Sequence, residues 1–326
     1  MQVGGKTGLM VRILLFIATF GTTYFVGHIT SNTQLYPYAG LWYSLPLMGI
    51  LLGHEMGHYL MCRYYGVRAT LPIFIPLPLP PFGTLGAVIM MRSPMPHRRA
   101  IFDIGLAGPL VGFALSLPAI LVGLHLSKTM DLRELLTYYA ANKPWLCSVG
   151  EPLLFSGLRN AIVGQISADM ALDFHPLAMA GWVGLFVTAL NLIPVGQLDG
   201  GHVLYALFGR RSIAISHGIV GGALALSAFL LLRYHVLWEY TVFVVLVSLL
   251  TYRFPHPAPT DELDPIGPGR KLAGILSLVL MAFSFTPQPF DIQDRSEVKE
   301  FLQQMDQDEQ QPNWTPEELQ KWARKV

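Results

Sequence analysis

Residues 41–62 read LWYSLPLMGILLGHEMGHYLMC, an apolar block that contains two histidines four positions apart and a glutamate beside the first. A hydrocarbon core requires roughly 20 consecutive apolar helical residues, and this block has that length. A carboxylate and two imidazoles are costly in lipid unless they are paired or functional. The block therefore predicts a membrane-spanning helix that carries a functional site.

The polar residues of this block are His54, Glu55 and His58. Residues four apart lie on one helix face, so both imidazoles can face a single ion. Glu55 then projects beside the metal, where it can take a proton from water. A chance occurrence of this short pattern is the alternative, and the apolar setting argues against it. The pattern predicts a Zn2+ site with Glu55 as a catalytic residue.

A catalytic zinc site takes three protein ligands and leaves one position open. Residues 59–101 contain no Asp or Glu, so the third ligand must come from farther along the chain. The best candidate is Asp199, in the stretch NLIPVGQLDGGH at 191–202, where proline and glycines interrupt an apolar run. Two alternatives remain: Asp199 could cap the helix that follows, and His202 could be a ligand or lie behind one.

Composition places the whole chain in a membrane class. Of its 326 residues, 52% are hydrophobic and 13% charged, against roughly 25% charged in a typical soluble domain. The fold class we expect is an all-α polytopic membrane protein with six to seven transmembrane helices. The apolar blocks that predict these helices are 9–29, 41–62, 103–125, 177–195, 213–232, 236–252 and 271–287. A net charge of +1 gives no general attraction to nucleic acid, and two cysteines are too few for a disulfide framework.

Residues 69–92 fit neither a membrane span nor a soluble loop, because they are largely apolar yet rich in proline. Irregular backbone at membrane depth is tolerated where protein or a wet cavity covers it. We expect a re-entrant loop followed by a short β-hairpin around 83–92. We also expect residues 1–290 to form a single membrane domain with its core at 41–208, and 291–326 to form a polar tail that could carry a short surface helix at 315–325.

Basic residues predict the orientation of the chain. With a cytoplasmic N-terminus, seven spans place 12 of the 22 Lys and Arg on the cytoplasmic side, as the positive-inside rule requires. The first apolar block lacks a clear cleavage site and predicts an uncleaved anchor. Because no transit-like N-terminus is evident, a multi-pass protein of a bacterial or archaeal plasma membrane is favoured over one of an organelle.

Two motifs together, HExxH in one span and NxxPxxxLDG in a later one, resemble the site-2 protease family of intramembrane metalloproteases (M50-like peptidases) over about 41–208. The resemblance implies that His54, His58 and Asp199 bind zinc, that Glu55 is the general base, and that Asn191 hydrogen-bonds the substrate carbonyl. It also implies that 69–92 accepts an unwound substrate as an added strand.

The resemblance implies an enzyme, a zinc metalloendopeptidase that cleaves membrane proteins within or near their transmembrane segments, as in regulated intramembrane proteolysis. The expected partners are the lipid bilayer and a membrane-spanning substrate, and no nucleic acid. A metal-ion transporter is an alternative, because intramembrane His and Asp also mark ion pathways. It predicts ligands spread over several spans, whereas here they concentrate at two motifs. An inactive membrane scaffold is a second alternative, and the intact motifs argue against it.

Overall fold

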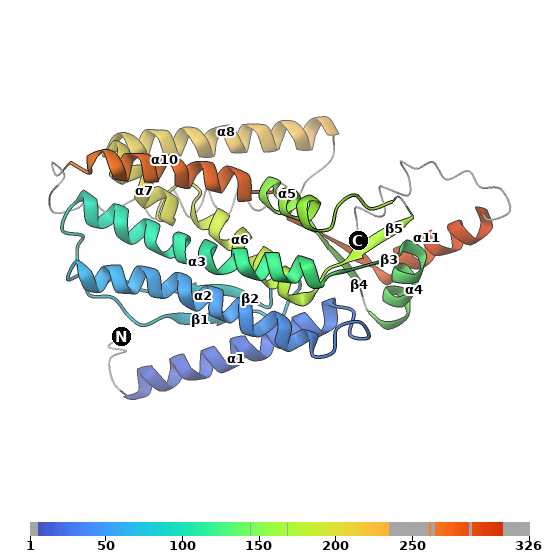
Figure 1. Cartoon of the computed structure of the whole chain (residues 1–326). Helices are drawn as coiled ribbons and strands as arrows, with labels where there is room; N and C mark the ends of the chain where they lie inside the picture. The colour runs from blue at the N-terminus through green and yellow to red at the C-terminus, as the bar shows by residue number, and fades with distance from the viewer. Residues whose placement is uncertain are drawn as a thin grey trace.

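The computed structural model describes residues 6–143, 145–167, 169–234, 261, 265–286 and 289–308. Long helices lie side by side in a bundle, and short helices and strands gather at one end of it (Figure 1). Within the described residues, three helices have the length and apolar composition to cross a bilayer: Gly8–Thr30, Arg98–Leu126 and Arg211–Arg233. The predicted helical membrane class agrees with this, while the count of six to seven spans stays a prediction. The block 236–252 lies outside the described residues.

The bundle consists of α1 (Lys6–Thr30), α2 (Ala39–Tyr64), α3 (Arg98–Leu126), α6 (Pro176–Asn191), α7 (Asp199–Phe208), α8 (Arg211–Tyr234) and α10 (Gly267–Ser284). At its centre α2, α3 and α6 pack on one another. Their shared core contains Leu47, Ile120, Trp182 and Leu185, all almost fully buried. These large apolar side chains hold three elements that come from distant parts of the sequence.

The apolar block at 177–195 is only partly helical, which corrects the expected span. α6 has 16 residues and ends at Asn191, and residues 192–198 form turns and bends before α7 begins. Pro194 lacks the N–H that a continuing helix requires. Gly196 has a φ of 54°, a left-handed conformation that glycine adopts without strain. The helix is therefore broken inside the bundle, at the place where proline and glycines interrupt the apolar run in the sequence.

A β-hairpin lies against α1 and α2. It pairs β1 (Ile73–Pro76) with β2 (Thr84–Val88) in antiparallel register, and a hydrogen bond from Arg92 N to Arg68 O extends the pairing to the open end. The hairpin expected at 83–92 is present, but its first strand comes earlier. The reason is that Pro78, Pro80 and Pro81 lie in the connection between the strands, where proline interrupts no ladder. The re-entrant placement of this segment stays a prediction.

Short elements pack together at the far end of the bundle from the N-terminus (Figure 1). This end cap comprises β3 (Lys128–Asp131), α4 (Leu132–Asn142), β4 (Trp145–Val149), β5 (Met170–Asp173), β6 (Phe290–Asp294) and α11 (Arg295–Asp308). Strand β3 pairs with β5, and β4 pairs with β6. A small core of its own includes Leu135, Leu136, Val298 and Phe301. A further helix, α5 (Leu153–Ile162), packs on α3 and α10 instead.

The end cap corrects two expectations. It adds two two-stranded sheets to the hairpin expected from the sequence, so the described part of the chain is mostly helical rather than all-α. Strands of four or five residues carry too short a pattern to be recognised in sequence. In addition, the first part of the polar tail at 291–326 folds against α4 and β4, while the helix expected at 315–325 lies outside the described residues. The division into a membrane domain and a tail stays a prediction.

Candidate metal site

His54, Glu55 and His58 lie in the C-terminal half of α2, where that helix packs against α3, and all three are buried. Nδ1 of His58 donates a hydrogen bond of 2.7 Å to the carbonyl oxygen of Ile104. Because a carbonyl can only accept, this contact puts the proton on Nδ1 and leaves the lone pair of Nε2 free. Metal-binding histidines are typically oriented in this way by a backbone carbonyl.

Asp199 approaches both imidazoles from α7. Its Oδ2 lies 3.3 Å from Nε2 of His54 and 3.2 Å from Nε2 of His58, and the two Nε2 atoms are 3.2 Å apart. The N-cap of α7 is Leu198, so the capping alternative for Asp199 is wrong. His202 is buried farther along α7 against Gly105, and it does not belong to the group whose ligand atoms converge.

The spacing of the three ligand atoms fits a small tetrahedral ion. Bonds of about 2.0–2.1 Å from zinc to nitrogen or oxygen put neighbouring ligands of a tetrahedron roughly 3.3 Å apart. The three sides of the triangle formed by His54, His58 and Asp199 are 3.2, 3.2 and 3.3 Å. Among the described residues this is the one group of three or more His, Cys, Asp or Glu side chains arranged to hold a metal ion. Two nitrogens and one carboxylate oxygen are also donors that zinc prefers.

Glycines on α3 make room for this triangle. A Cβ added at Gly108 would overlap Nε2 of His58, and one added at Gly112 would lie 3.0 Å from Nδ1 of His54. The sequence analysis did not assign this steric role to Gly108. The available signal was the spacing of Gly105, Gly108 and Gly112, because small residues on one face of a membrane helix allow close packing.

Glu55 and Asn191 complete the set of residues selected from the sequence. The carboxylate of Glu55 faces the backbone N–H of Ile89, the residue that follows β2. Nδ2 of Asn191, the last residue of α6, lies 3.1 Å from Nε2 of His54. The structure therefore brings α2, α3, α6, α7 and the hairpin to one place. The contact with Ile89 is a feature that the sequence reasoning missed, since nothing in the pattern paired it with Glu55.

A bundle with membrane-length helices and a buried His–His–Asp triangle next to a glutamate defines a class, membrane proteins with an HExxH metal site. The family model described as "Peptidase family M50" matches residues 42–233 of the chain. This match covers more than half of the chain, and the chain belongs to peptidase family M50. The family expected from the two motifs is thereby confirmed.

Similar proteins carry names that agree with this family. "Probable zinc metalloprotease EGY1, chloroplastic" of Arabidopsis thaliana is 33% identical over 265 residues, 78% of this chain and 44% of the relative. The rice (Oryza sativa subsp. japonica) protein of the same name is 32% identical over 255 residues, 74% of this chain and 39% of the relative. "Probable zinc metalloprotease EGY2, chloroplastic" of Oryza sativa subsp. indica is 28% identical over 257 residues, 76% of this chain and 44% of the relative.

The chain thus spans less than half the length of these relatives. The location printed in their names is the chloroplast. The names do not bear out the bacterial or archaeal plasma membrane expected from the sequence, nor the cytoplasmic N-terminus, and both stay predictions.

Proposed function

We propose that the chain is a membrane-embedded zinc metalloendopeptidase that hydrolyses peptide bonds within or near transmembrane segments of other membrane proteins. The observation that carries the proposal is the triangle of His54, His58 and Asp199, whose sides fit a tetrahedral zinc site. These three residues are the proposed ligands. Bound zinc would supply a Lewis acid that polarises the scissile carbonyl and makes water a nucleophile at neutral pH.

Glu55 is the proposed general base. It follows His54 directly on α2, so its carboxylate stands beside the ligand triangle, and the N–H of Ile89 orients it. In this position it can take a proton from the attacking water and return that proton to the leaving amine. Burial excludes bulk water from the carboxylate, which strengthens its electrostatic interactions with the reacting groups.

Asn191 is the proposed positioning group for the scissile peptide. Its amide nitrogen is near the ligand atom of His54, at the end of α6 where the backbone unwinds. An amide N–H in that position can donate a hydrogen bond to the substrate carbonyl and to the oxyanion that develops from it. The same group would then act on the substrate together with Glu55.

The hairpin is the proposed support for an extended substrate. A transmembrane helix protects its peptide bonds by internal hydrogen bonding, so the substrate has to unwind before cleavage. An unwound segment can pair with a sheet edge as an added strand. Because Ile89 directly follows β2 and contacts Glu55, a strand that pairs with this hairpin would pass close to the ligand triangle.

The orientation in the membrane belongs to the same proposal. We keep the N-terminus on the cytoplasmic side of a bacterial or archaeal plasma membrane, because the short basic loops are expected there. Arg12 near the start of α1 and Arg63 near the end of α2 lie at one end of the bundle and support this topology.

The test is cleavage of a transmembrane peptide with a helix-breaking centre by the purified full chain, together with metal analysis. We expect Glu55→Gln to lose about 10²–10⁴-fold in rate, the usual contribution of general acid–base catalysis. Asp199→Ala is expected to lose bound zinc. Glu134→Gln, at an exposed acid on α4, is the matched control and keeps both properties.

Two outcomes would contradict the assignment. Cleavage by Glu55→Gln at the parent rate would exclude Glu55 as the base, and full zinc occupancy in Asp199→Ala would exclude Asp199 as a ligand. Zinc flux through liposomes that carry the chain, without peptide cleavage, would favour the transporter. Zinc binding with neither flux nor cleavage would favour the inactive scaffold.

A further inference from the structure

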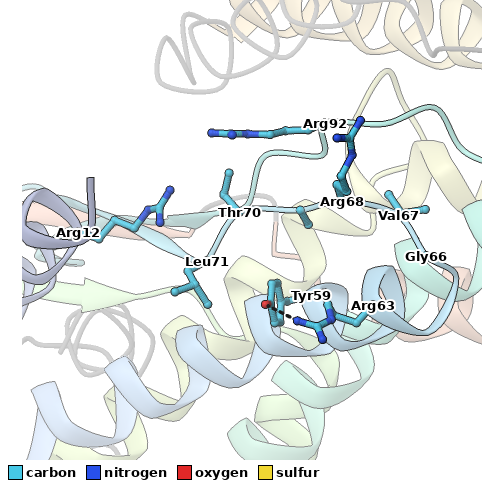
Figure 2. Close-up of a pocket in the computed structure, with 10 residues that line it drawn as sticks. Arg12, Tyr59, Arg63, Gly66, Val67, Arg68, Thr70, Leu71 and Arg92 are labelled. Carbon is cyan, nitrogen blue, oxygen red and sulfur yellow. Dashed lines mark hydrogen bonds between the residues drawn. The ribbon is translucent and has the colours of Figure 1, made fainter. Parts of the chain in front are cut away.

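A pocket of about 760 Å³ opens beside the hairpin at the end of the bundle that carries the N-terminus of α1 (Figure 2). It is separate from the zinc ligands, none of which lines it. Four of its ten lining residues are arginines: Arg12, Arg63, Arg68 and Arg92. Figure 2 shows that they come from different elements, with Arg12 on α1, Arg63 on α2, and Arg68 and Arg92 on the two arms of the hairpin.

The charge of this pocket is not balanced by the protein. Its lining has no Asp or Glu, and residues 1–102 contain one carboxylate, Glu55, which belongs to the metal site. Among the described residues, no ion pair joins any of the four arginines to an acid. Nε of Arg12 is buried and has no hydrogen-bond partner in the described part of the chain. Buried donors of this kind are usually satisfied by an unseen ion, ligand or water.

The hairpin places two of these charges opposite each other. Arg92 N donates a 2.7 Å hydrogen bond to Arg68 O, so the two residues face one another across paired strands. Like charges directly opposite on neighbouring strands are destabilising. Arg63 adds a third charge at the end of α2 and has the neutral hydroxyl of Tyr59 as its near contact. An anion between these arginines would remove the repulsion and satisfy their forked donors, which match phosphate geometry.

The surroundings of the pocket indicate where such an anion comes from. Leu9 and Phe16 lie on the same face of α1 as Arg12, three positions before it and four after it, and are 51% and 36% exposed, as expected for a face in contact with acyl chains. Leu71, which lines the pocket itself, is 41% exposed and adds a further apolar side chain. Basic pockets between membrane helices on the cytoplasmic side are sites where phospholipid headgroups bind.

We propose that Arg12, Arg63, Arg68 and Arg92 bind the phosphate headgroup of an anionic phospholipid, whose acyl chains lie along the exposed apolar face of α1. The lipid closes the open end of the hairpin, because Arg68 and Arg92 then share one phosphate. The binding site does not depend on the proposed protease activity. A free phosphate offers the same group to the arginines but has no acyl chains to contact the apolar face of α1, so it binds far more weakly than the lipid.

The test is titration of the detergent-solubilised full chain with dioleoyl-phosphatidylglycerol, with bound lipid measured by native mass spectrometry. The double variant Arg68→Gln/Arg92→Gln is expected to bind roughly thirtyfold more weakly, the loss expected when two basic residues stop contributing at an anionic surface. The control Arg211→Gln/Lys271→Gln removes two exposed charges from the start of α8 and α10 and keeps the parent affinity. Arg68→Lys/Arg92→Lys keeps the charge and is expected to recover part of the binding.

Further binding measurements distinguish a phospholipid from other anions. The zwitterionic dioleoyl-phosphatidylcholine is expected to bind at least tenfold more weakly, and millimolar inorganic phosphate is expected not to displace the lipid. The proposal is overturned if the Arg68→Gln/Arg92→Gln variant binds phosphatidylglycerol like the parent, or if the charge control loses as much. Displacement by equimolar phosphate would assign the pocket to a free anion. Tighter, arginine-dependent binding of an acidic peptide would assign it to a protein partner.

Zinc content, measured in parallel, shows that each variant has folded. Because the readout is lipid binding and not peptide cleavage, failure of this inference leaves the proposed protease activity untouched. A chain that binds the lipid but cleaves no peptide would leave the inference standing.

Discussion

Gly108 leaves no room for a side chain beside the candidate metal site. Its Cα hydrogen faces the ring of His58, and a methyl group in that position would overlap Nε2, the atom that faces Asp199. α2 and α3 can approach this closely only where α3 has no side chain. The ligand triangle is therefore defined by a residue that contributes no ligand.

Gly108→Ala is expected to reduce bound zinc from about one per chain to near zero, because His58 must leave the triangle to avoid the added methyl group. Metal analysis of the purified protein measures this. Gly49→Ala on α2 is the control, since a Cβ at Gly49 meets nothing within 4 Å. Zinc content at the parent level in Gly108→Ala would show that the two helices can separate without loss of the site.

Helix α10 is bound to the centre of the bundle by a polar contact near its own N-terminus. Arg270 forms a two-pronged contact with Asp103 of α3, with Nε–Oδ1 at 2.8 Å and Nη2–Oδ2 at 2.7 Å. The hydroxyl of Tyr65, at the end of α2, donates to the same carboxylate. One acidic side chain thus joins three helices. This matters for the site because α10 also packs on α6 and α7, which carry Asn191 and Asp199.

Arg270→Gln is expected to lower the free energy of unfolding by about 1–2 kcal/mol, since two charge-assisted hydrogen bonds are lost at a partly exposed position. Thermal unfolding in detergent measures it, and hydrogen exchange of α10 should rise. Lys271→Gln changes the neighbouring exposed charge and leaves both unchanged. If the effects of Arg270→Gln and Asp103→Asn simply add, the two residues do not act as a pair.

Polar contacts join the end cap to the bundle. The hydroxyl of Tyr36, in the α1–α2 connection, donates to the carbonyl of Asp173 at 2.7 Å, and Nζ of Lys143 donates to the carbonyl of His28 at 3.0 Å. Asp173 is 4% exposed, and burial raises the pKa of its carboxyl group to about 6. Burial also lowers the pKa of Lys143. The junction is therefore sensitive to pH on the acidic side of neutrality.

The direction of the pH dependence of the free energy of unfolding follows from the raised pKa of Asp173. Between about pH 4 and pH 6 the folded chain keeps a proton that the unfolded chain has released, so the free energy of unfolding falls as the pH rises through this window. The change from this carboxyl group is at most about 3 kcal/mol. Asp173→Asn should remove this part of the pH dependence in thermal unfolding, whereas Asp169→Asn, at an exposed position, should not. Equal pH profiles for the parent and Asp173→Asn would show that Asp173 does not titrate in this window.

Much of the fold could be predicted from the sequence because membrane helices have long, uniform signals. The apolar blocks at 9–29, 103–125 and 213–232 coincide with α1, α3 and α8. The end cap could not be predicted in this way. Its strands have four or five residues, and β4 and β6 pair although 140 residues lie between Val149 and Phe290. Such pairs depend on which surfaces remain after the bundle has packed.

Residues 41–62 by themselves determined that His54 and His58 lie on one face of a helix and that Glu55 is next to them, because helical periodicity puts residues four apart on one face. They could not determine that Asp199 completes the triangle. The tertiary structure alone determines the position of Asp199, since this residue reaches the histidines only where α6 has ended and α7 begins. The triangle also needs a bare backbone at Gly108, which lets α2 pack against α3 closely enough for three ligand atoms to meet within 3.3 Å.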